Sequence, residues 1–321
     1  MKKSLKAIIK FSDEVLSSLQ LKLCEEKKSL IIFAFHGLFF NKQEIDSNQA
    51  DPQERITVGL FRRFIDYYLT YGYTFTSPEE ILNGLGNDKK YILVSFDDGY
   101  FSTQRALPIL REYQIPAVFF ISTSNVQYNK CFWWDVLYRA RIRQGRSLKD
   151  ISSERQGLMS KTTNEIEDYI RDIFGEKALR PISDIDRPFT PAELREFSKE
   201  KYVSIGNHTA DHAILTNYCS DGIKSQILDC QNTLYEITGT TPVLISYPCG
   251  VYSDKVIEIS KAIGLRIGVT VEQRKNYLPI NWGDGSIMRL GRFTLSGQGD
   301  LVKQCETFRS GMVLYNWIKN L

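Results

Sequence analysis

The sequence predicts an α/β fold around a parallel sheet, and three observations carry this prediction. From residue 29, short runs rich in β-branched and aromatic residues alternate with helical patterns, which is typical of βα units. Single α/β barrels reach the length of 321 residues, so one large core is feasible. A content of 42% hydrophobic and 25% charged residues is that of an ordinary globular protein.

The chain is expected to begin with a helical extension at residues 1–28. Its first residues form an amphipathic pattern, and Lys6, Lys10 and the acids of the FSDE run interrupt the apolar stretch of a signal peptide. No later stretch reaches the ~20 apolar residues of a membrane span. Because the six cysteines contain no CxxC pair, a reducing compartment fits best. We therefore expect a cytoplasmic protein whose barrel domain occupies 29–321.

Six runs are the candidate strands of the sheet. Each is short, apolar and flanked by turn or helix signals. They are LIIFAF at 30–35, YILVSF at 91–96, AVFFI at 117–121, YVSIG at 202–206, VLIS at 243–246 and RIGVT at 266–270. The charged, helix-prone stretch at about 132–189 interrupts this rhythm, so we interpret it as a helical insertion between barrel units.

Helices are predicted between these strands from periodicity and end signals. The SPEE run at 77–80 and the TPAE run at 190–193 each resemble a capping box with proline in the first turn. Gly239 and Gly264 close two further helical patterns. The run at 58–69 places four side chains on one helical face: Phe61, Phe64, Ile65 and Tyr68.

The residues that carry chemistry gather in a few short runs. His208 and His212 stand four apart in HTADH, so on one helical turn they would project from the same face and converge on one cation. Asp97 and Asp98 follow the YILVSF run, and His36 follows LIIFAF. The net charge of +3 and the lack of a long basic run argue against a nucleic-acid partner.

Together, SFDDG after one strand and HTADH after another resemble the first two motifs of the polysaccharide deacetylase family, the NodB-homology group or carbohydrate esterase family 4. The resemblance covers about residues 29–295, and it implies a distorted (β/α) barrel. It also implies that Asp98, His208 and His212 hold a divalent metal and that Asp97 is the general base. This oxygen and imidazole ligand set suits Zn²⁺, and also Co²⁺ or Ni²⁺.

The third family motif is altered here to ISYPCG, in which Ser246 stands in the arginine position. Pro248 is retained, so the turn is expected to persist and the amide of Cys249 becomes the candidate oxyanion donor. Arg292 is our candidate for the missing arginine, and Arg289 is the second choice. Four aromatic residues could stack on a sugar or simply pack: Tyr247, Trp282, Trp133 and Trp134.

No histidine follows His212, although the family normally supplies a late histidine as general acid. His36 lies where a branch that resembles the poly-N-acetylglucosamine deacetylases places its catalytic histidine. The resemblance therefore implies that His36 protonates the leaving amine. A nucleophilic role for Cys249 is disfavoured because a cysteine enzyme needs a dedicated base beside its thiol.

The resulting prediction is a metal-dependent hydrolase that removes an N-acetyl group from an amino sugar of a polysaccharide or glycan precursor. Two alternatives remain open. One is a catalytically degenerate, metal-containing carbohydrate-binding protein, and the other is a metal-dependent amidase that acts on a non-sugar substrate.

Overall fold

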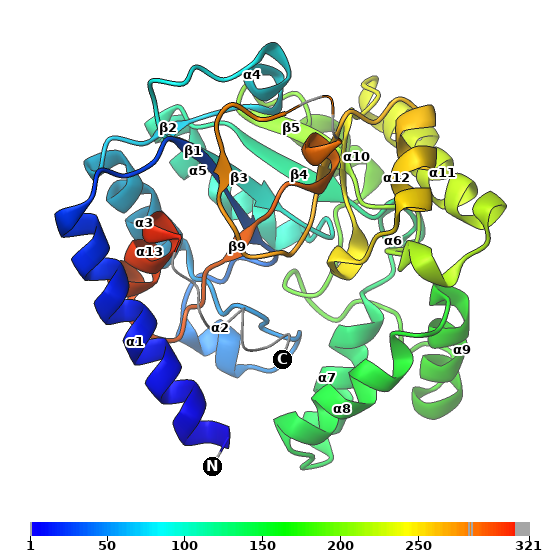
Figure 1. The fold of residues 1–321 in the computed structure, drawn as a ribbon. Helices are drawn as coiled ribbons and strands as arrows, with labels where there is room; N and C mark the ends of the chain where they lie inside the picture. Colours follow the sequence, from blue (N-terminus) through cyan, green and yellow to red (C-terminus); the bar gives the residue numbers. More distant parts are fainter. Residues whose placement is uncertain (1, 282, 284, 312–321) are drawn as a thin grey trace.

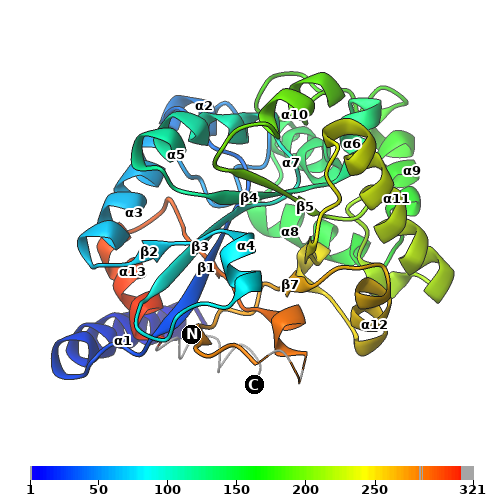
Figure 2. The same ribbon diagram turned by 90° about the horizontal axis from the view of Figure 1, so that it is seen from above.

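The computed structural model describes residues 2–281, 283 and 285–311, together with the side chains from residue 12 onward within these ranges. Its centre is one curled, mostly parallel sheet wrapped by helices (Figure 1 and Figure 2). Along the main path the strands follow the order β7-β6-β5-β4-β3-β1-β8. This arrangement is the distorted (β/α) barrel that the sequence predicted.

All six predicted strands are present, within one residue of their expected ends. Three short strands were missed because two residues each are too few to produce an alternating pattern. The strands are β1 (Ser29–Phe35), β2 (Thr74–Phe75), β3 (Tyr91–Phe96), β4 (Ala117–Ile121), β5 (Val203–Asn207), β6 (Leu244–Ser246), β7 (Ile267–Val269), β8 (Asn276–Tyr277) and β9 (Phe293–Thr294).

The barrel is closed by the segment at residues 290–294. Leu290 forms a parallel bridge with Val269 of β7, and Phe293 of β9 pairs in parallel with Phe33 of β1. The segment therefore lies between β7 and β1 and joins these two strands. Arg292 lies in the middle of this closing segment.

Helices cover the outside of the sheet, and the predicted end signals are present. Ser77 with Glu80 and Thr190 with Glu193 form complete capping boxes. The α-helices are α1 (Lys2–Leu23), α2 (Lys42–Asp46), α3 (Val58–Thr70), α4 (Pro78–Asn83), α5 (Leu107–Tyr113), α6 (Thr123–Tyr128), α7 (Trp133–Arg143), α8 (Leu148–Leu158), α9 (Thr163–Phe174), α10 (Pro191–Phe197), α11 (Ser220–Thr238), α12 (Asp254–Ala262) and α13 (Leu301–Ser310). The four side chains predicted on one face of α3 are all buried.

Helices α7, α8 and α9 form the predicted insertion between β4 and β5, and they project from one side of the barrel (Figure 1). They have their own small apolar cluster, which includes Phe132, Trp134 and Ile170. Trp133 and Trp134 are both buried there, which makes them packing residues first. This apolar packing therefore holds the helices of the insertion in a fixed arrangement.

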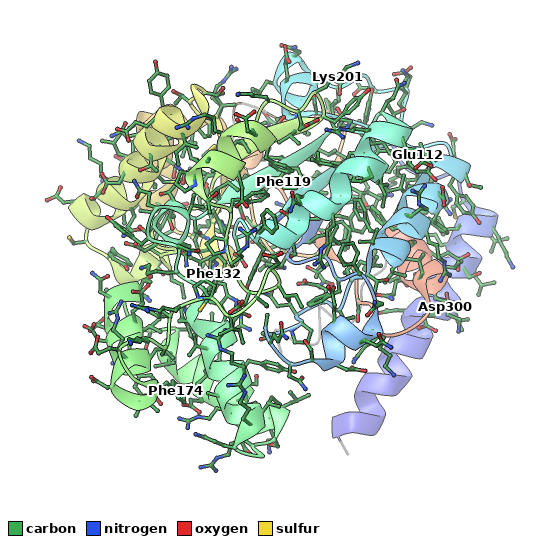
Figure 3. All side chains as sticks on the ribbon, turned by 180° about the vertical axis from the view of Figure 1, so that it is seen from behind. Glu112, Phe119, Phe132, Phe174, Lys201 and Asp300 are labelled. Carbon is green, nitrogen blue, oxygen red and sulfur yellow. The ribbon has the colours of Figure 1, made fainter. Side chains whose placement is uncertain are left out.

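The core lies on both faces of the sheet, and Figure 3 shows how densely side chains fill it. Phe33 and Phe35 of β1 contact the aromatic rings of α3. Within the described part of the chain, no helix is long and apolar enough to cross a membrane.

Candidate metal centre and active site

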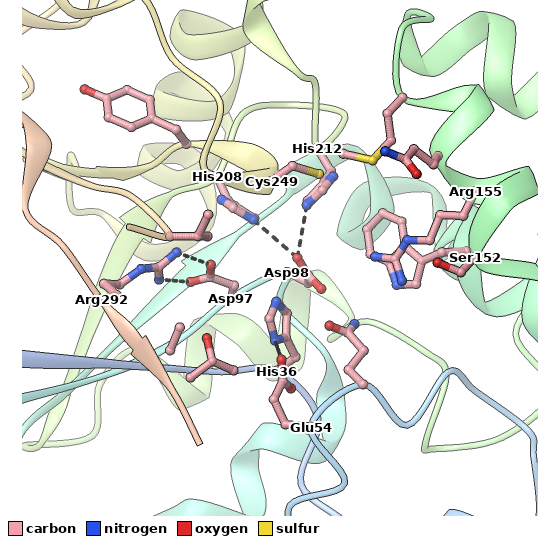
Figure 4. Close-up of a pocket in the computed structure, with 18 residues that line it drawn as sticks. His36, Glu54, Asp97, Asp98, Ser152, Arg155, His208, His212, Cys249 and Arg292 are labelled. Atoms are coloured by element: carbon pink, nitrogen blue, oxygen red, sulfur yellow. Dashed lines mark hydrogen bonds and ion pairs between the residues drawn. The ribbon is translucent and has the colours of Figure 1, made fainter. Parts of the chain in front are cut away.

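Asp98, His208 and His212 converge at the carboxyl ends of β3 and β5. The Nε2 atoms of both histidines lie 3.3 Å from Oδ1 of Asp98 (Figure 4). One potential ligand atom from each residue lies within 4.8 Å of the others. Asp98 and His208 are buried. In a parallel barrel, the carboxyl ends of the strands are where sites form.

The ligand set fits a divalent cation. Both carboxylate oxygens of Asp98 are buried; Oδ2 has no hydrogen-bond partner and Oδ1 has only the two imidazoles 3.3 Å away, which would be costly if nothing ever bound there. Nδ1 of His208 lies 2.8 Å from the carbonyl oxygen of Ser246, so this ring donates through Nδ1 and leaves Nε2 free as a ligand. Burial lowers the pKa of His212, which favours the neutral, ligating form.

The prediction that HTADH forms a helical turn is wrong. After β5 the chain forms an irregular loop, in which Thr209 and His212 adopt left-handed φ angles of 63° and 52°. The Oγ1 atom of Thr209 accepts a hydrogen bond from the amide of Ala213 at 2.7 Å and so braces the loop. The two imidazoles converge because of this loop geometry rather than because of helical spacing.

Trp134 supports the centre from the insertion. Its ring lies with its centroid 4.6 Å from that of His212, and its indole nitrogen donates to Tyr100 at 2.8 Å. The hydroxyl of Tyr100 in turn donates to the buried carboxylate of Asp135. The insertion therefore fixes one metal-ligand candidate through a ring contact.

Asp97 and Arg292 form a buried, bidentate ion pair. The two guanidinium nitrogens donate to the two carboxylate oxygens at 2.7 and 2.8 Å. Burial alone would raise the pKa of Asp97, but Arg292, His208 and His36 lower it to about 2. Asp97 is therefore ionised throughout the neutral range.

The guanidinium of Arg292 is fully hydrogen-bonded, so its position is rigid. Its remaining donors reach Thr270 O at 2.9 Å, Ser95 Oγ at 3.1 Å and Ser246 Oγ at 2.9 Å. Ser246, in the altered motif, also donates to Asp97 at 3.0 Å. Arg292, just before β9, and Ser246, in the altered motif, thus both bond to the carboxylate of Asp97, as a substitute for the motif arginine would have to do. Sequence reasoning missed Ser95 and gave Ser246 no contact.

The other residues named from the sequence have different surroundings. Arg289, the second choice, pairs instead with Asp254 on α12. Tyr247 is wholly buried at the pocket wall, donates to the carbonyl oxygen of Met288 and packs its ring against Tyr252, so packing accounts for its position and the stacking role stays a prediction. Pro248 is buried, and Cys249 takes a left-handed φ of 56° and lines the pocket. Trp282 lies outside the described residues.

His36 lies at the end of β1 beside Glu54, a residue that sequence reasoning missed. Its Nδ1 atom is 2.9 Å from Oε1 of Glu54. Burial would lower the pKa of His36, but the charges of Glu54, Asp98 and Asp97 raise it to about 10. A cation held by Asp98 would offset part of this rise. The neighbouring carboxylates therefore favour the protonated form of the ring, and Figure 4 shows it on a different side of Asp98 from Asp97.

These side chains line one pocket with a volume of about 480 Å³, within the range of small-ligand sites. The insertion provides one wall through residues spaced along a single face of α8 and just beyond it: Ser152, Arg155, Gln156 and Met159. The loop that carries Gln53 and Glu54 provides another wall. Arg155 connects the two walls, because it pairs with Asp51 at 3.0 Å.

Fold and site together define a (β/α) barrel protein with a candidate metal centre at the carboxyl ends of its strands. The family model described as polysaccharide deacetylase matches residues 85–268, which is more than half of the chain. This chain belongs to the polysaccharide deacetylase family.

Comparisons with individual proteins agree with this family. YxkH of Bacillus subtilis (strain 168), named as a polysaccharide deacetylase, is 23% identical over 206 residues, which are 63% of this chain. The match spans only about half of YxkH, 53% of its length.

Solved structures show the same fold. The deacetylase PplD of Streptococcus pyogenes, in complex with acetate, aligns with a TM-score of 0.59 and 18% identity over 88% of this chain and 99% of that one. IcaB of Ammonifex degensii aligns with a TM-score of 0.57 and 16% identity over 89% and 98%. BC0361 of Bacillus cereus has a TM-score of 0.58 and 16% identity over 88% and 69%.

Proposed function

We propose that this protein is a metal-dependent hydrolase that removes an N-acetyl group from an amino sugar of a polysaccharide or glycan precursor. The observation that carries the proposal is the presence, in one pocket, of a cation ligand set, a carboxylate held by an arginine and a histidine paired with a glutamate. Metal-assisted amide hydrolysis uses these three components. Membership of the deacetylase family supports the carbohydrate substrate.

Asp98, His208 and His212 would hold the metal, for which Zn²⁺ is the first candidate and Co²⁺ or Ni²⁺ the next. When bound, a divalent ion supplies Lewis acidity toward the amide carbonyl and lowers the pKa of water. The remaining steps are performed by residues of the chain itself.

Asp97 accepts the proton of the attacking water, and Arg292 with Ser246 keeps its carboxylate in one orientation. The water oxygen bonds to the acetyl carbon, and the bond from that carbon to the sugar nitrogen breaks. His36 donates a proton to the departing nitrogen, and the amide of Cys249 is the proposed hydrogen-bond donor to the oxyanion. The products are acetate and a free amino sugar.

The first test is acetate release from N-acetylglucosamine oligomers by the metal-stripped protein after addition of Zn²⁺, Co²⁺ or Ni²⁺. Activity is expected only after metal addition. His208→Ala is expected to lose metal and activity together, whereas Asp97→Asn keeps the metal and loses activity. If Asp97→Asn retained near wild-type turnover, the proposed base would be wrong.

The same assay separates the two alternatives. A degenerate carbohydrate-binding protein, favoured by the lack of a histidine after His212, would bind metal and oligomer without releasing acetate. An amidase of another class would turn over simple N-acetyl amides faster than the sugar. The buried ion pairs of Asp97 and His36 favour the enzyme, because a binding protein would not need them. We also propose a cytoplasmic location and a domain boundary at residue 28.

A further inference from the structure

A small cavity lies at the end of the barrel opposite to the active-site pocket. It has a volume of about 210 Å³ and is formed by the last turn of α1, the loop before β1, the start of β8 and the end of α13. β8 pairs with the amino end of β1 at Ser29 and Leu30, whereas His36 follows the carboxyl end of β1. Since β1 has seven residues, roughly 20 Å of strand separates the cavity from the candidate metal centre.

Two buried cations line this cavity. Lys275 is 5% exposed and Arg309 is 7% exposed. An ammonium group has three donors, but among the described residues Nζ of Lys275 has one acceptor, the carbonyl oxygen of Arg309 at 2.6 Å. Nε of Arg309 is buried and has no hydrogen-bond partner in the same part of the chain. Both cations therefore have donors without an acceptor, which is costly for buried groups.

The charges around the cavity are also unbalanced. Glu26 accepts hydrogen bonds from Arg309 at 2.8 Å and from Lys90 at 3.1 Å. With Lys275, three positive charges surround this one carboxylate, which leaves a surplus of two. Burial, with repulsion from the neighbouring cations, lowers the pKa of Lys275 to about 8. A negative charge in the cavity would remove this repulsion.

Size and charge together indicate the class of ligand. Sites for drug-sized organic molecules usually have volumes of ~300 to 1,000 Å³, so this cavity suits a smaller ligand. Glu25 and Lys27 also line it, and their opposite charges leave the surplus unchanged. An oxyanion with two negative charges matches the surplus. Its several oxygens accept short, charge-assisted hydrogen bonds from ammonium and guanidinium groups.

We propose that this cavity binds a small inorganic oxyanion of the phosphate and sulfate class, with Lys275 and Arg309 as its donors. The anion provides the acceptors that these two cations lack. It connects the start of β8 to the end of α13, so its binding stabilises the folded protein at this junction. This inference does not depend on the proposed enzymatic function.

The first test is titration calorimetry of the full chain with inorganic phosphate and, separately, with sulfate, at pH 7 and constant ionic strength. One anion is expected to bind per chain, and the two titrations show which anion binds more tightly. Lys275→Met is expected to weaken binding about tenfold or more, because a charged donor is lost. Glu26→Gln is expected to strengthen binding, because it removes the carboxylate that competes for the same cations.

The pH dependence of sulfate binding is a second readout. Sulfate keeps its charge between pH 7 and 9, whereas Lys275 loses its proton as pH rises through about 8. Sulfate binding by the wild type is therefore expected to weaken across this range, and this part of the dependence is expected to be absent in Lys275→Met. The other charged groups around Lys275 are Glu26, Lys90, Arg309 and Lys27.

Two control variants are expected to bind the anion like the wild type. His208→Ala alters the candidate metal centre, and Arg63→Gln alters another pocket lined by basic residues. Circular dichroism checks that each variant is folded, and Glu26→Gln decides the matter if Lys275→Met is not. The proposal is overturned if neither anion binds the wild type, if either control loses binding, or if Lys275→Met binds as tightly as the wild type. Unchanged or weaker binding by Glu26→Gln also overturns it.

Discussion

At the scale of single residues, His36, with Glu54 beside it, is the proposed general acid in place of the late histidine that the sequence lacks. His36→Ala is expected to lower kcat by ~100 to 10,000-fold, the usual range for general acid catalysis. Metal content and KM are expected to change little, since His36 is not among the ligand candidates. Elemental analysis and steady-state kinetics check this. A variant with unchanged kcat would move the acid role to another group.

Glu54→Gln tests how the acid is kept protonated. Burial lowers the pKa of His36 and Glu54 is the largest of the charges that raise it, so removing that charge lowers the pKa. Because folding raises the pKa of His36, protonation of this ring stabilises the folded protein at pH values below the usual pKa of histidine. That stabilisation is lost as pH rises through about 10. The alkaline limb of the kcat/KM profile is therefore expected to move to lower pH in Glu54→Gln. The exposed Glu112→Gln is the control, and an unmoved limb contradicts the assignment.

At the scale of elements, the pocket depends on a contact between α8 and the loop before α3. Arg155→Gln breaks the ion pair with Asp51 that connects the two walls. A partly exposed pair contributes only about 0.2 to 1 kcal/mol, so the melting temperature is expected to change little. KM for an N-acetylglucosamine oligomer is expected to rise, because the pocket wall that carries Gln156 is then no longer bound to the loop of Asp51. Arg111→Gln, which breaks another exposed pair with Glu200, is the control and leaves KM unchanged.

The elements were predictable where local chemistry determines them. The strand that contains Phe33 could be predicted from its run of consecutive apolar residues. The capping box of Thr190 could be predicted because its residues lie within one helical turn of the sequence. The loop of His208 and His212 could not, because its left-handed residues are fixed by contacts with distant parts of the chain. The placement of Arg292 opposite Asp97 is a long-range contact, and the prediction of that pairing depended on the family resemblance.

One residue of the site, Glu54, left no local trace in the sequence. Glu54 lies on an irregular loop in which Gln53 and Arg55 both have positive φ angles. No motif in the neighbouring sequence marks Glu54 as a partner of His36.

At the scale of the whole molecule, the junction of α1, β8 and α13 contains a buried lysine. Lys275 donates to the carbonyl oxygen of Arg309 at 2.6 Å near the end of α13. Burial, with repulsion from Lys90, Arg309 and Lys27, lowers the pKa of Lys275 to about 8. The folded state therefore releases this proton more readily than the unfolded state does.

Lys275→Met tests this coupling between charge and stability. Between about pH 8 and 10.5 the unfolded chain binds more protons at this position, so the wild type gains stability as pH rises through that window. The gain is on the order of 3 kcal/mol. Lys275→Met lacks this gain. The difference in free energy of unfolding between the wild type and the variant is therefore expected to change between pH 8 and 10.5. Urea unfolding at pH 7, 8, 9 and 10.5 measures it, with Lys255→Met as the exposed control; parallel pH curves would contradict the prediction.

The closing segment of the barrel has a consequence for the order in which the site is made. Asp97, Asp98, His208 and His212 all precede Arg292 in the chain and are therefore synthesised before it. Until residues 290–294 dock between β7 and β1, the carboxylate of Asp97 has no guanidinium to orient it. A nascent chain could therefore capture a metal ion before its base is in place. Under the proposed mechanism, an incomplete chain would therefore be kept from acting on amides until the barrel closes.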